Sequence, residues 1–115
     1  HENIRDFHID GVASQANIGR HTREWVVADE QCPHMKNHRM WRAGISDAAY
    51  GFCFVREVNF SQVMVCTGGE GEVWLGSHWE PCTDGMAYLT PPDVAHAYRA
   101  LAGTRWQLAW VIYEN

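Results

Sequence analysis

From residue 50 onward, short apolar segments are separated by turn residues every eight to twelve positions, which strongly limits the possible folds. Residues 50–58 and 60–67 are rich in Phe and Val, as strands typically are. Gly68–Gly71 predicts a turn, because glycine adopts a positive φ without steric cost. Gly76–His78 predicts a hairpin turn. This spacing predicts an all-β sandwich or barrel of about eight short antiparallel strands.

The last segment, 104–113, shows the clearest strand pattern. Trp106, Leu108, Trp110 and Ile112 fall on one face of a strand, since successive side chains alternate between faces. Residues 96–100 predict the strand before it, and prolines 91 and 92 break the chain ahead of that strand because proline cannot donate to a ladder. A barrel of this size has an interior just wide enough for packed side chains or one small ligand.

The first 49 residues are more polar and less regular. Arg23–Ala28 predicts one strand, 14–22 predicts a loop, and Cys32–His38 is too short and polar to assign. At 115 residues the chain has the length of one domain. We therefore expect residues 1–49 to form an irregular arm and the first barrel strands, and residues 50–115 to form the barrel core.

Composition excludes several classes of function. The formal net charge is −5 and the single lysine is Lys36, so we expect no binding of nucleic acid by this domain. No apolar stretch approaches the roughly 20 residues that cross a membrane, so we expect no membrane association. The four cysteines form no CxxC motif, which favours reduced thiols in a cytoplasmic protein.

The segment from Gly68 to Tyr113 resembles the N-terminal effector-binding domain of AraC-type transcription regulators. The matching pieces, in order, are Gly69–Gly71, Pro81–Pro92, His96–Tyr98 and Trp106–Tyr113. The resemblance implies a jelly-roll barrel of the cupin type that holds a sugar or a similar effector. In that family, dimerisation helices and a helix-turn-helix domain follow the barrel. Because this chain stops at Asn115, we expect it to be the sensor part of such a regulator; the alternative is a stand-alone cupin.

Six residues are the predicted ligand contacts on the inner face of the barrel: Arg56, Gln62, His96, Tyr98, Trp106 and Trp110. The resemblance matches Tyr98 to a pocket tyrosine and Trp110 to a tryptophan on which the apolar face of the sugar rests. Arg56 lies near the place of a pocket arginine. Leu108 stands where the arabinose-binding member has a histidine, which argues against arabinose. Trp106 and Trp110 could equally be core residues, since indole rings fill barrels well.

Metal and catalytic chemistry find little support in the sequence. Metal-binding cupins carry an HxH pair and a Glu before the glycine motif, but here Gln62 takes the Glu position and only His96 fits a histidine position. Cys32, His34 and His38 lack a fourth ligand. No Ser/His/Asp arrangement is evident. We therefore expect no metal, no cofactor and no enzymatic activity; the alternative is a small metal-dependent isomerase or dioxygenase.

The expected partner is a small polar effector, a sugar or a sugar acid. We expect the full-length parent to be a homodimer. The fragment alone should associate weakly, and any pairing should use an open barrel edge, because an unpaired strand edge invites pairing.

Overall fold

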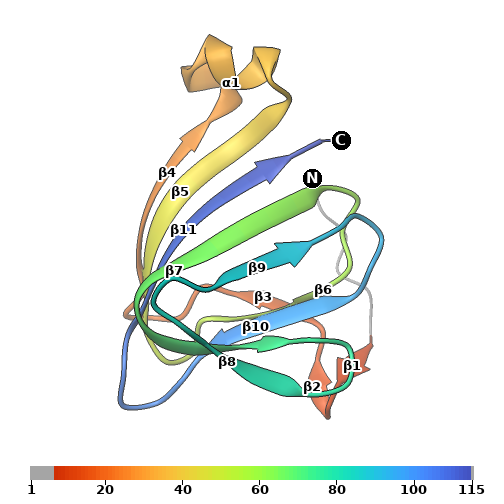
Figure 1. The fold of residues 1–115 in the computed structure, drawn as a ribbon, viewed down its shortest axis with the longest axis vertical. Coiled ribbons are helices and arrows are strands. Elements are labelled where there is room, and N and C mark those ends of the chain that lie inside the picture. Colours follow the sequence, from red (N-terminus) through yellow and green to blue (C-terminus); the bar gives the residue numbers. More distant parts are fainter. Residues whose placement is uncertain (1–6, 115) are drawn as a thin grey trace.

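A computed structural model describes residues 7–114 of the chain, and its elements are shown in Figure 1. The elements are mostly strands, with one short 3-10 turn and one short helix. Their bounds in chain order are β1 His8–Ile9, β2 Val12–Ala13, β3 Gln15–Asn17, β4 Arg23–Ala28, η1 Asp29–Gln31, α1 Pro33–Asn37, β5 Met40–Ala48, β6 Cys53–Arg56, β7 Ser61–Trp74, β8 Trp79–Thr83, β9 Ala87–Thr90, β10 His96–Ala100 and β11 Trp106–Tyr113. The all-β expectation is confirmed.

Two curled sheets face each other, and the long strand β7 belongs to both. Its first part, up to Gly69, pairs with β11 and β9 in the sheet ordered β9-β7-β11-β5-β4. From Glu70 it pairs with β8, and from Gly71 with β10, in the sheet that also contains β6 and β3. Every one of these pairs is antiparallel, as a jelly roll requires. We call these the β11 sheet and the β10 sheet.

The glycine-rich segment Gly68–Gly71 is not a turn, so that prediction is wrong. It lies inside β7, where the register against β11 shifts between Gln107 and Leu108. Gly69 has φ +71°, and a Cβ there would lie 1.9 Å from the carbonyl oxygen of Arg105. Glycine is therefore needed for a bulge that bends the strand and passes it from one sheet to the other.

The N-terminal region is more regular than its sequence indicates. β5 was not expected, yet it spans Met40–Ala48 and joins β4 to β11 in one sheet. The expected strand at Arg23–Ala28 is confirmed as β4, and the expected loop at 14–22 contains the short strand β3. Pro33 begins the helix α1, as proline favours the first position of a helix. Neither helical segment within residues 7–114 is long and apolar enough to cross a membrane.

The main core fills the space between the two sheets. Trp106 and Leu108 of β11 are fully buried there with Met64 and Cys66 of β7. The Trp106 ring lies against the backbone of Gly71, where a Cβ would come within 2.2 Å of the ring. The packing of the Trp106 ring therefore requires glycine at position 71.

The outer face of the β10 sheet is covered by the chain's own N-terminal region. Ile9 of the β1–β2 hairpin packs with Val55 and Ala97 in a second, smaller apolar cluster. Asp10 accepts a hydrogen bond of 3.1 Å from the indole nitrogen of Trp79 on β8. The hairpin thus removes apolar surface of this sheet from water, which stabilises the fold.

Candidate ligand cavity

A cavity of about 160 Å³ lies between the two sheets, beside the core. At about 30 Å³ of liquid per water molecule, it holds the volume of roughly five waters. Side chains from both sheets line it: Ile18, Glu24, Val26, Arg42, Phe52, Phe54, Arg56, Gln62, Met64, Tyr98, Trp110 and Ile112. Four of the six predicted contacts, Arg56, Gln62, Tyr98 and Trp110, are therefore brought together around one space. Their role in binding stays a prediction.

Arg56, at the end of β6, is the central polar group of the cavity. Only 4% of it is exposed, and its Nη2 lies 3.4 Å from both Gln62 Oε1 and the Tyr98 hydroxyl, to which it donates. The guanidinium also stands over the ring of Phe54, 4.7 Å from its centroid. The Phe54 ring stacks on Tyr98 at 5.1 Å. These contacts place a buried guanidinium, a group with five N–H donors, in the wall of the cavity.

Trp110 forms a flat wall of the cavity, and its ring is held by a short relay of hydrogen bonds. Its indole nitrogen donates to Ser46 Oγ at 2.8 Å, and Ser46 Oγ donates to Glu24 Oε2 at 2.6 Å. The ring lies over Gly44 of β5, where a Cβ would come within 2.5 Å of ring carbon Cζ2. The glycine thus lets the ring lie flat across the strand.

His96 and Trp106 do not line the cavity. His96 is 3% exposed, its ring stacks nearly parallel to Tyr98, and its Nδ1 lies 3.2 Å from the carbonyl oxygen of Val94. Trp106 is fully buried against Gly71, and its indole nitrogen has no hydrogen-bond partner among the described residues. In this structure both support the wall of the cavity from behind.

Several lining residues were not predicted. Glu24 and Arg42 come from β4 and β5, and Phe52 and Phe54 precede Arg56. The signal for Phe54 was present, since it lies two residues before Arg56 and strand alternation places both on one face. Glu24 and Arg42 carried no such signal, because charged side chains on a strand normally face water.

The described residues hold no cluster of metal-binding side chains, and the buried Cys82 lies outside the cavity lining. Within residues 7–114, no three His, Cys, Asp or Glu side chains gather closely enough to hold a metal, and this includes Cys32, His34 and His38. All four cysteines are free thiols. Burial raises the pKa of the Cys82 thiol to about 11, so it stays protonated and is a weak nucleophile near neutral pH.

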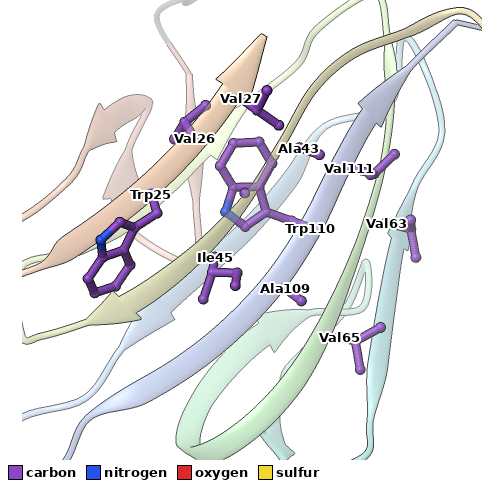
Figure 2. A pocket seen from close by; sticks show the side chains of 11 residues that line it. Trp25, Val26, Val27, Ala43, Ile45, Val63, Val65, Ala109, Trp110 and Val111 are labelled. Atoms are coloured by element: carbon purple, nitrogen blue, oxygen red, sulfur yellow. The ribbon is translucent and has the colours of Figure 1, made fainter. Parts of the chain in front are cut away.

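A second, larger hollow of about 610 Å³ lies on the outer face of the β11 sheet, and Figure 2 shows it. It is shallow and open, and its lining side chains are apolar, Trp25, Ile45 and Val65 among them. Small-molecule sites enclose their ligand and place a few polar groups to orient it. The cavity between the sheets is about half open and is lined in part by Arg56, Gln62 and Glu24, so it fits this description better than the outer hollow does.

Comparison with solved structures identifies the fold. The Cupin_2 domain of an XRE-family transcriptional regulator from Enterobacter cloacae is 14% identical, has a TM-score of 0.66, and is matched over 84% of this chain and 99% of that chain. An RmlC-like cupin from Shewanella frigidimarina is 19% identical, with a TM-score of 0.64 over 99% and 94% of the two chains. KdgF from Halomonas sp. is 16% identical, with a TM-score of 0.60 over 82% and 80%. At such identities the likeness shows the fold alone, a cupin barrel.

Sequence comparison then gives the family. A comparison with curated protein sequences gives no match. The family model of the AraC-like ligand-binding domain matches residues 46–115, which is more than half of the chain and includes most of the cavity wall. The resemblance of the segment from Gly68 to Tyr113 is confirmed by this match. The chain is therefore a cupin-type, small-molecule-sensing domain that belongs to the AraC-like ligand-binding domain family.

Proposed function

We propose that this domain is the effector-sensing part of an AraC-type transcription regulator and that its inter-sheet cavity binds one sugar or sugar acid. The observation that carries the proposal is the grouping of Arg56, Gln62 and Tyr98 with the flat ring of Trp110 around one cavity. Polar groups that orient a ligand and an aromatic face that shelters it are the usual parts of a small-molecule site.

The chemistry of the cavity favours a compact molecule with several hydroxyl groups. The ring of Trp110 offers an apolar face for the C–H groups of a sugar. Arg56 and Gln62 supply donors for hydroxyl or carboxylate oxygens, and Glu24 supplies an acceptor. A volume of about 160 Å³ is too small for a long acyl chain. A monosaccharide or its acid fits this set better than a lipid does.

The proposed role is sensing rather than catalysis. In the parent regulator, other domains would contact DNA and form the homodimer, and this acidic barrel would bind only the effector in the cytoplasm. One similar structure is itself part of a transcriptional regulator, which supports this context.

The competing role is that of a metal-dependent cupin enzyme. Elemental analysis of the purified domain tests it: we expect no stoichiometric transition metal, and one metal per chain would support the enzyme instead.

Calorimetric titration tests the binding proposal. The titrants are aldopentoses, aldohexoses and their uronic acids, with octanoate as the apolar control. We expect one of the sugars or acids to bind, and Tyr98→Phe to weaken that binding about tenfold through the lost hydroxyl. The matched control is Tyr88→Phe, since the Tyr88 hydroxyl donates to the Trp74 carbonyl at 2.7 Å and lies outside the cavity. No binding across the panel, or equal weakening by both variants, would contradict the proposal.

A further inference from the structure

Glu24 stands on the inward side of β4, the edge strand of the β11 sheet. Its neighbours Arg23 and Trp25 are exposed, whereas the Glu24 side chain is partly buried and lines the cavity. A charged side chain on a strand normally faces water. The inward position of this carboxylate therefore points to a partner inside the cavity.

The Glu24 side chain is held by the relay of hydrogen bonds that starts at Trp110. The indole N–H of Trp110 donates to Ser46 Oγ at 2.8 Å, and an indole nitrogen can only donate. The hydroxyl hydrogen of Ser46 is therefore directed to Glu24 Oε2, 2.6 Å away. Ser46 is fully buried and lies directly opposite Glu24 on the paired strand. The relay thus has one direction, and it ends on Glu24 as an acceptor.

Ser46 occupies only part of the accepting capacity of Glu24. A carboxylate has about four lone-pair sites on its two oxygens. Within residues 7–114, Glu24 receives no hydrogen bond besides the one from Ser46 and forms no ion pair. Because the side chain lines the cavity, its remaining sites are available to a donor on the ligand.

We propose that Glu24 is the specificity-determining residue of the cavity and restricts the ligand to molecules that donate a hydroxyl hydrogen at this wall. This role rests on the proposed function and narrows its ligand class to polyhydroxy compounds. A guanidinium such as that of Arg56 suits any small carboxylate, whereas Glu24 binds only donors. A site built to bind a hydroxyl group rejects the analogue that lacks it, because the polar group of the protein then stays unpaired.

The two charged groups lie in opposite walls of the cavity. Arg56 belongs to β6 in the β10 sheet, and Glu24 belongs to β4 in the β11 sheet. A ligand between them meets a cation on one side and an anion on the other. A carboxylate turned toward Glu24 is repelled, so an acid must present hydroxyl groups on that side. The pair of walls therefore excludes simple aliphatic acids and admits sugars and hydroxylated acids.

Calorimetric titration with fluorinated ligands tests the proposal. The probes are the sugar or uronic acid that binds the wild type most tightly and its monofluoro analogues, each with fluorine in place of one hydroxyl group. Fluorine is close to a hydroxyl group in size but cannot donate a hydrogen bond. We expect at least one analogue to bind the wild type about tenfold or more weakly than the parent ligand. In Glu24→Gln this gap should shrink to about threefold or less, because the amide can donate to fluorine.

The matched control is Glu80→Gln. Glu80 is also a carboxylate on a strand, with Oε1 2.8 Å from His78 Nε2, but it lies outside the cavity lining. This variant should keep the wild-type gap between the parent ligand and its analogue. Circular dichroism checks that both variants are folded. If Glu24→Gln is misfolded, Glu24→Ala replaces it, with the same loss of discrimination expected.

Two results overturn the role of Glu24 while a sugar or uronic acid still binds. The first is a gap that stays unchanged in the folded Glu24 variant. The second is pentanoate, a carboxylate without hydroxyl groups, binding the wild type as tightly as the best sugar or uronic acid. If no sugar or uronic acid binds the wild type, the proposed function itself fails, and the role of Glu24 fails with it.

Discussion

Gly44 packs against the ring of Trp110, which lines the cavity, so its replacement by alanine tests both the fold and the site. A Cβ at this position would lie 2.5 Å from Trp110 Cζ2 and 2.9 Å from the carbonyl oxygen of Trp25. Real Cβ contacts of this length do not occur, so the Trp110 ring must move. Displacing the ring breaks its hydrogen bond to Ser46 and pushes it into the cavity.

The magnitude of the Gly44→Ala effect follows from three contributions. Overpacking costs about 1–3 kcal/mol, and loss of one hydrogen bond costs about 1 kcal/mol. The lower backbone entropy of alanine in the unfolded chain offsets about 0.5–1 kcal/mol. We therefore expect the free energy of unfolding to fall by about 1–3.5 kcal/mol. Binding of the proposed sugar should also weaken, because the cavity has lost volume.

Urea denaturation followed by tryptophan fluorescence measures this change. Gly68→Ala is the matched control, because a Cβ there would meet only the flexible end of the Gln107 side chain, at 2.8 Å. We expect the control to change stability by less than about 1 kcal/mol. If Gly44→Ala is as stable as the control and leaves the Trp110 fluorescence unchanged, the ring does not lie over Gly44 and the reasoning is refuted.

Two further predictions concern the core. Gly71→Ala should destabilise the domain by about 2 kcal/mol or more, because its Cβ would lie 2.2 Å from the Trp106 ring. Gly85 has φ +89° and open space around it, so Gly85→Ala should cost only about 1 kcal/mol. Thermal unfolding of the two variants compares these losses. Burial raises the pKa of Cys82 from 9.0 to about 11 in the folded chain. Below pH 9 the thiol is protonated in both the folded and the unfolded state. As the pH rises to 11 the unfolded state loses this proton first, so the free energy of unfolding falls by about 2–3 kcal/mol. Urea denaturation across this range should show a smaller loss in Cys82→Ala, and an identical slope would contradict the assignment.

The strands that the sequence predicts well are those whose alternation is apolar toward the core. β11 places Trp106 and Leu108 inside, and both are fully buried. β10 and the hairpin into β8 were found in the same way. In these strands the local pattern and the tertiary environment agree, which is the condition under which sequence patterns are reliable.

β5 was missed because its pattern is inverted. Its inward positions include Arg42, which lines the cavity, and Gly44 and Ser46, which contact the Trp110 ring, whereas the outward-facing Ile45 is 55% exposed. Alternation assigns apolar residues to the core, and here the polar side faces inward. In a strand that lines a polar cavity on one side and exposes apolar side chains on the other, the apolar positions face water. Alternation of apolar residues therefore predicts the wrong face as buried.

The error at Gly68–Gly71 has a different cause. Glycines mark both turns and bulges, and the local sequence does not distinguish them. The distinction comes from Arg105, whose carbonyl oxygen occupies the space where a side chain at Gly69 would lie. That contact joins residues far apart in the chain, so only the folded structure reveals it.

Nuclear magnetic resonance of the six tryptophan indole N–H groups tests the central claim, that the ligand enters the inter-sheet cavity, most directly. Each resonance is assigned by a single Trp→Phe variant, and the spectrum is recorded while the best-binding sugar or sugar acid is titrated. We expect the Trp110 resonance to shift at saturation, because its ring lines the cavity, while the exposed Trp25 on the outer face stays unchanged. A shift of Trp25 with Trp110 unmoved would place the ligand on the outer face and contradict the account.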